Sequence, residues 1–88
     1  MRESLLEYKE QAVEAVATMN MLRLAVDRQE RQAAEKELQA ICALTEGNTD
    51  QAKRLWQERT VLDRHLERIK QELAAAAEAA RAIMQVFQ

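Results

Sequence analysis

The side chains that could carry chemistry are few in this chain of 88 residues, which has one histidine, His65, and one cysteine, Cys42. Ser4 is its single serine, so a nucleophile, a base and a group that orients the base cannot be assembled. A Glu-x-x-His metal motif is also absent, because position 62 is Leu. We therefore expect no catalytic residue, no metal and no cofactor, and the chain is predicted not to be an enzyme.

Composition indicates the fold class and the compartment. One glycine, no proline and a large share of Ala, Glu, Gln, Leu, Arg and Lys are typical of long helices and coiled coils. The chain has no disulfide framework and no charged-then-apolar leader, so we expect it to be cytoplasmic. A net charge of -2 disfavours nucleic-acid binding, and the most apolar segment, residues 73–87, is too short to span a membrane.

The strongest pattern lies in residues 51–87. With Ala52 as position a of a heptad, apolar residues follow one another at spacings of three and four, and only Arg59 interrupts them. The a positions are Ala52, Arg59, Leu66, Leu73, Ala80 and Phe87, and the d positions are Leu55, Leu62, Ile69, Ala76 and Ile83. This spacing predicts a long helix that buries one narrow stripe, the seam, against a partner helix.

A first helix is predicted at about residues 5–45. Ser4 and Glu7 have the spacing of a capping box, which favours a helix start near Leu5. Apolar residues keep a spacing of three and four up to Val26, and polar residues then dominate. The apolar spacing resumes near the end of the segment, at Leu38, Ile41 and Leu44.

A tight turn is predicted at residues 46–49. Gly47 can end a helix in the left-handed conformation without a Cβ penalty, and Asn48 or Thr49 can cap a second helix at about 50–87. So short a loop makes the two helices antiparallel neighbours. The fold class is therefore all-α, a single coiled-coil-like hairpin domain over residues 1–88, which we expect to complete a four-helix bundle with a second copy or a partner.

Pairing the helices about this turn places small side chains opposite large ones. Ala40 then faces Leu55, and Ala33 faces Leu62. Arg59 comes near Glu37 and is expected to form an ion pair with it. The turn half of the hairpin is accordingly expected to be polar and thinly packed, whereas the open end is apolar.

The open end carries more apolar surface than a two-helix seam can bury. Exposed apolar surface of this kind usually marks a protein interface. We therefore predict a protein-interaction module, a small chaperone or adaptor that binds another protein or a second copy of itself. The predicted partner-binding residues are Leu6, Val13, Val16, Met21, Leu24, Met84, Val86 and Phe87.

Two alternatives stay open at this point. Trp56, beside the seam, is either a lid over it or an anchor for a partner. The alternative function is a homodimeric four-helix-bundle regulator that binds nucleic acid through the basic residues of the second helix, although acidic residues are interspersed among them. Those basic residues are Lys53, Arg54, Arg64 and Arg68.

The turn and the start of the second helix resemble one known family. Gly47-Asn48-Thr49-Asp50, Trp56-Gln57, and then Leu62, Leu66 and Ile69 are similar to the same region of the small helical-hairpin co-chaperones of type III secretion needle subunits. The resemblance implies a short cytoplasmic hairpin that acts with a second, helical-repeat chaperone to keep a needle subunit from polymerising before export. It also implies that an apolar flank contacts that chaperone and that Trp56 packs on the second helix.

Overall fold

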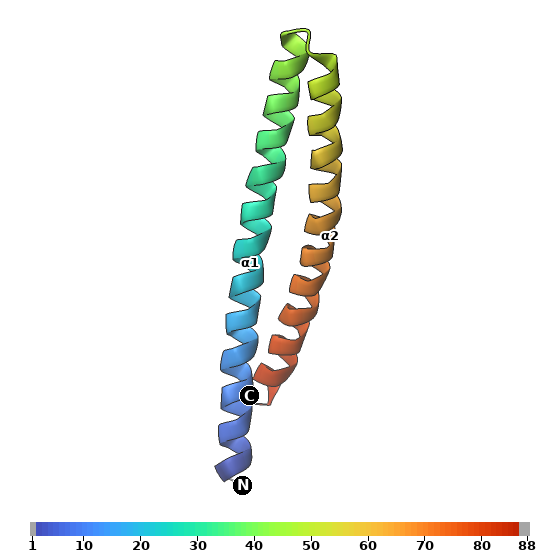
Figure 1. Ribbon diagram of the computed structural model, residues 1–88. Coiled ribbons are helices and arrows are strands. Elements are labelled where there is room, and N and C mark those ends of the chain that lie inside the picture. The colour runs from blue at the N-terminus through green and yellow to red at the C-terminus, as the bar shows by residue number, and fades with distance from the viewer. Residues whose placement is uncertain (1, 87–88) are drawn as a thin grey trace.

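The chain folds into two antiparallel helices joined by a tight turn (Figure 1). The structure, a computed structural model, describes residues 2–86 and the side chains of residues 5–86. Helix α1 spans Arg2–Thr45 and helix α2 spans Thr49–Gln85, and together they form a rod of 69 × 17 × 14 Å. The all-α fold predicted from composition is confirmed for this part of the chain, which contains no strand.

Helix α1 runs without interruption through the polar segment in its middle. It begins at Arg2, so Ser4 lies within the helix and not at its N-cap. Arg2 is a good helix former and Glu3 is favourable near a helix N-terminus, so neither residue stops the helix where the capping-box spacing suggested.

The turn forms where Gly47 predicted it. Gly47 has a φ of 80°, the left-handed region that an L side chain adopts at a cost. The amide of Asn48 donates to the carbonyl of Ala43 at 2.8 Å, and the amide of Gly47 donates to that of Leu44 at 3.0 Å. These two bonds make a Schellman motif, which satisfies carbonyls at the end of α1.

Asn48 starts the second helix at the same point. Its side-chain oxygen accepts from the amide of Gln51 at 3.3 Å, so it is the N-cap of α2, one of the two caps expected. Asp50 follows in the first turn, where a carboxylate is favourable against the helix dipole. One glycine and one cap therefore reverse the chain within three residues.

The seam between the helices is built mainly from small side chains. Every described a and d position of α2 is buried or half-buried, as the heptad pattern predicted. In α1 the buried positions recur at the same spacing, and all of them except Val26 are alanine. The buried residues are Ala12, Val26, Ala33, Ala40, Ala43, Ala52 and Ala80, and no polar or charged residue among those described is buried.

Ion pairs cross the seam in its polar middle. The Arg59 guanidinium lies 3.2 Å from the Glu37 carboxylate, which confirms the expected pair, and the Lys36 amine lies 2.8 Å from Glu58. These pairs are partly exposed, so each is worth about 0–1 kcal/mol. Their main effect is on alignment, because a sliding of α1 along α2 would separate both pairs at once.

The expectation that the turn half of the hairpin is thinly packed is wrong, whereas its predicted seam residues Ala33 and Ala40 are buried. Leu38, Ile41 and Leu44 are all exposed, and Ala33, Ala40 and Ala43 are buried in the seam. A seam through the three large residues would require α1 to rotate away from the face that it buries over its first half. The alanines continue that face without a break, and the turn end is therefore closely packed, with apolar residues on its outside.

Enlarging a seam alanine should force the helices apart. We expect Ala33→Leu, at a site only 7% exposed, to lower the free energy of unfolding by about 1–3 kcal/mol through overpacking. The matched control is Ala74→Leu on the exposed side of α2, which should change stability by less than about 0.5 kcal/mol. Urea unfolding followed by circular dichroism measures both, and equal effects of the two would contradict the close packing.

Replacing Gly47 should lower the stability of the hairpin only through the left-handed backbone conformation at this position. Nothing lies within 4 Å of a Cβ placed on Gly47, so a side chain there meets no steric obstacle. We expect Gly47→Ala to lower stability by about 1 kcal/mol, and Gly47→Asn to lower it less, because Asn tolerates the left-handed region. The same unfolding measurement applies, and an Ala variant as stable as the Asn variant would disprove this account.

Candidate interaction surfaces

The apolar residues predicted to bind a partner are exposed but do not form one face. Those described, from Leu6 to Val86, are between 39 and 71% exposed, whereas Phe87 lies outside the described residues. The heptad position of each residue, with Ala12 taken as an a position of α1, gives the side of the hairpin on which it lies. Leu6, Val13, Met21 and Leu24 lie on the outer side of α1, Val16 and Met84 lie on one flank of the hairpin, and Val86 lies on the opposite flank.

The flank that carries Val16 and Met84 is fixed by an ion pair at its centre. The Lys70 amine lies 3.5 Å from the Glu30 carboxylate, so these two positions are neighbours across the helices. Two heptads toward the open end, the same positions are Val16 and Met84, and two heptads toward the turn they are Leu44 and Trp56. We call these six residues the Trp56 flank, and it is apolar at both ends and charged in the middle.

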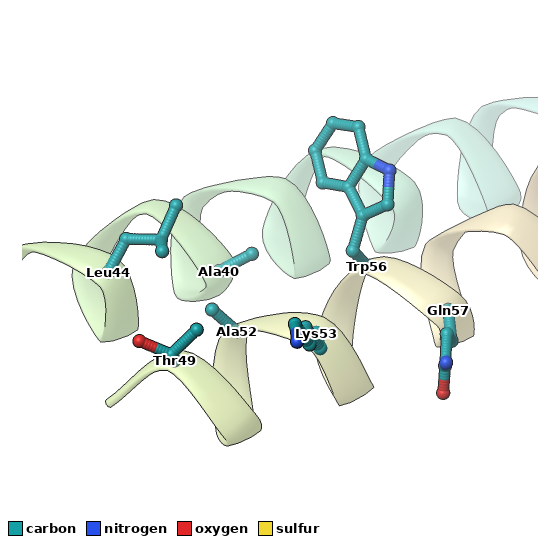
Figure 2. A pocket seen from close by; sticks show the side chains of 7 residues that line it. All are labelled: Ala40, Leu44, Thr49, Ala52, Lys53, Trp56 and Gln57. Atoms are coloured by element: carbon teal, nitrogen blue, oxygen red, sulfur yellow. The ribbon is translucent and has the colours of Figure 1, made fainter. Parts of the chain in front are cut away.

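A groove opens on the Trp56 flank next to the turn. Its lining comes from both helices and is predominantly apolar (Figure 2). Ala40 and Ala52 lie low between the helices, and the larger side chains of Leu44 and Trp56 rise beside them. The residues that line the groove are Ala40, Leu44, Thr49, Ala52, Lys53, Trp56 and Gln57.

Sequence reasoning missed this groove because it expected exposed apolar surface only at the open end of the hairpin. The residues that could have indicated the groove are Ala40 and Ala52, both of which lie in the seam close to the turn. Small residues there do not fill the space beside the seam, and a large neighbour on the same flank then forms a wall of a groove. The turn end is therefore a second apolar surface, besides the open end.

Trp56 forms one wall of the groove and remains 51% exposed. The Arg59 guanidinium carbon lies 4.9 Å from the centre of its ring, a cation–π contact worth about 0.5–1 kcal/mol at an exposed site. Arg59 in turn lies within ion-pair distance of Glu37 and Asp63. The indole is thus held by its neighbours while much of its surface stays open to a partner.

The remaining chemistry-bearing residues are not assembled into a site. His65 and Cys42 are both exposed. Within residues 2–86, no group of three or more His, Cys, Asp or Glu side chains is placed to hold a metal ion. Over that same range, neither helix combines the length and the apolar character that crossing a membrane requires.

The basic residues of the nucleic-acid alternative lie on the outside of α2. All four of them, Lys53, Arg54, Arg64 and Arg68, are exposed, and none forms an ion pair with another residue whose side chain is described. Asp50, Glu67 and Glu78 are exposed on the same side of the helix. The outer side of α2 is therefore of mixed charge and not a basic patch.

Truncating a residue of the Trp56 flank should leave the fold almost intact. We expect Leu44→Ala, at a site 60% exposed, to change the free energy of unfolding by less than about 0.5 kcal/mol. Leu66→Ala, in the half-buried seam, should lower it by about 1–3 kcal/mol, because it removes packed methyl groups. If thermal unfolding shows equal losses for both, Leu44 belongs to the core and not to a free surface.

Comparison with known proteins adds no relative to these observations. The chain matches no family model, no curated protein and no solved structure. Its function must therefore be inferred from the surfaces of the hairpin itself.

Proposed function

We propose that the chain is a non-enzymatic protein-interaction module, a small chaperone or adaptor that binds a partner protein through the apolar surface at the open end of the hairpin. The observation that carries this proposal is the distribution of side-chain size. Alanine fills most of the buried seam, whereas fourteen large apolar side chains are exposed among residues 5–86. A surface of this size and character usually marks an interface.

The energetics of burial favour the same conclusion. Each buried methylene group is worth about 0.8 kcal/mol, so a seam of alanines gains little from burial compared with leucines or valines. The larger side chains would contribute that stabilisation only after a partner covers them. Binding therefore both occupies the surface and stabilises the hairpin, as expected when a ligand binds only the folded state.

The shape of the surface favours a helical partner. The Trp56 flank runs along both helices, so a further helix laid against it would contact α1 and α2 together and extend the pair toward a bundle. Met84 at its open end is flexible enough to adapt to an irregular partner surface. The ion pairs at its centre place charged groups where a partner helix could align with them.

The cellular role that we propose is in a bacterial type III secretion apparatus. This part of the proposal is supported by the resemblance of the turn and the start of α2 to the needle-subunit co-chaperones. A co-chaperone role is compatible with the exposed apolar residues of the hairpin, because a co-chaperone needs apolar surface and no catalytic group. The nucleic-acid alternative is not favoured by any specific observation, because acidic residues share the outer side of α2.

Affinity capture from the native host tests the proposed interaction. We expect the tagged chain to retain a defined protein, and Val16→Glu with Met84→Glu to abolish retention, because two charges would then be buried without partners. Gln71→Glu with Ala74→Glu adds the same charge on the exposed outer side of α2 and should leave retention unchanged. If no protein is retained, or if both double variants retain it equally, the proposed binding surface is wrong.

A further inference from the structure

We propose that the outer side of α1 pairs with α1 of a second copy of this chain in antiparallel orientation, with Asp27 and Arg31 forming reciprocal ion pairs at the centre. This inference rests on the proposed role as an interaction module and names the partner of one of its surfaces. It concerns the side of α1 that faces away from α2, and it does not use the Trp56 flank.

The outer side of α1 carries a second apolar stripe with the same spacing as the seam. Its residues occupy the b and f positions of the heptad that places Ala12 at position a, nearly opposite the seam. The apolar members of this outer stripe are Leu6, Val13, Ala17, Leu24, Ala34, Leu38 and Ile41, and all of them are exposed. A helix with apolar stripes on two opposite sides has room for two helical neighbours, and α2 supplies only one.

The corresponding side of α2 is polar. Its b and f positions contain one apolar residue, Ala74, and the others are charged or polar. They are Asp50, Lys53, Gln57, Thr60, Arg64, Glu67, Gln71, Glu78, Arg81 and Gln85. The two outer sides of the hairpin therefore differ, and a second helix has apolar surface to bury only on α1.

Two opposite charges interrupt the outer stripe at its middle, and Glu10, Asn20 and Thr45 occupy its other non-apolar positions. Asp27 and Arg31 occupy successive b and f positions, and together with Leu24, Arg28, Gln32 and Glu35 they line one shallow hollow on α1. Neither side chain forms an ion pair with any residue between 5 and 86. Both charges lie between two apolar stretches. A partner helix with the opposite order of charges, a base facing Asp27 and an acid facing Arg31, would pair with both of them.

A second copy in antiparallel orientation presents that opposite order. In an antiparallel pair, b positions of one helix face f positions of the other, so a two-fold axis between Asp27 and Arg31 brings each aspartate to the arginine of the second copy. The same alignment sets Leu24 against the second copy's Ala34, and Ile41 against its Ala17. Large residues face small ones in these two layers, as interdigitated packing requires, and Leu38 and Val13 face Asn20 and Thr45. A parallel pair would instead place like charges together.

This pairing leaves the Trp56 flank available. The four helices would lie in the order α2, α1, α1, α2, with each α2 on the outside. Val16 and Met84 lie on the flank of each hairpin and outside the contact between the two copies of α1. One dimer could therefore present two copies of the surface that we propose for a partner protein.

Charge exchange at Asp27 and Arg31 tests both the partner and the orientation. Static light scattering over a concentration series gives the mass of the purified chain, and we expect a dimer for the natural sequence. Asp27→Arg and Arg31→Asp should each raise the dimer dissociation constant by about tenfold or more, because like charges then face one another twice. Glu67→Arg, a charge reversal on the outer side of α2, should have no such effect.

Mixing the two variants gives the decisive result. An equimolar mixture of Asp27→Arg and Arg31→Asp should restore the dimer, since each arginine pair then faces an aspartate pair, and the double variant Asp27→Arg/Arg31→Asp should dimerise by itself. Restoration also shows that each single variant is folded, which circular dichroism checks independently. A monomeric natural chain, or single variants that dimerise as well as the natural chain, would overturn the inference.

The outcome is separable from that of the proposed function. A monomeric chain that still retains a protein through Val16 and Met84 overturns the self-pairing and leaves the proposed function standing. A charge-dependent dimer that retains no protein supports the self-pairing and overturns the proposed function.

Discussion

Alanine occupies most of the buried positions where the two helices of this hairpin meet, and the other features of the molecule depend on that constraint. Small side chains let the backbones approach closely, and they leave the leucines and isoleucines of α2 only half covered. A hairpin with such a seam gains limited stability from its own burial. Most of the large apolar residues that are exposed lie on the outside of α1 and on the Trp56 flank. The same choice of residues therefore explains both a thin core and an apolar exterior.

The charged middle of the hairpin determines how the helices align. A seam of alanines discriminates weakly between neighbouring alignments, because one alanine layer resembles the next. The pairs of Arg59 with Glu37 and of Lys36 with Glu58 connect specific residues and would be lost on sliding. Polar groups in a coiled-coil seam commonly specify alignment at some cost in stability, and Arg59 fits that use. The buried Nε atom of Arg59, which has no hydrogen-bond partner in the structure, shows part of that cost.

The sequence predicted α2 and the turn well and predicted α1 less well. In α2 one apolar stripe stands out against polar neighbours, and the burial follows it. In α1 two stripes compete near the turn, one through Ala33 and Ala40 and one through Leu38 and Ile41. Pairing the helices about the turn placed Ala33 and Ala40 in the seam, and the structure buries both because they continue the seam of the first half. The apolar surface that Leu38, Ile41 and Leu44 leave on the outside was not predicted. The predicted binding residues are exposed as expected where described, but their division between an outer stripe and a flank depends on which stripe faces α2.

Trp56 gives the hairpin an internal optical signal. It is the single tryptophan of the chain, it forms a wall of the groove near the turn, and a guanidinium lies against its ring. The fluorescence of an indole depends on its contact with water, so a molecule that fills the groove would shift the emission to shorter wavelength and shield the ring from a dissolved quencher. A helix that packs only on the outer stripe of α1 would leave both properties unchanged. The natural chain, without any label, can thus distinguish which of its two apolar surfaces has been covered.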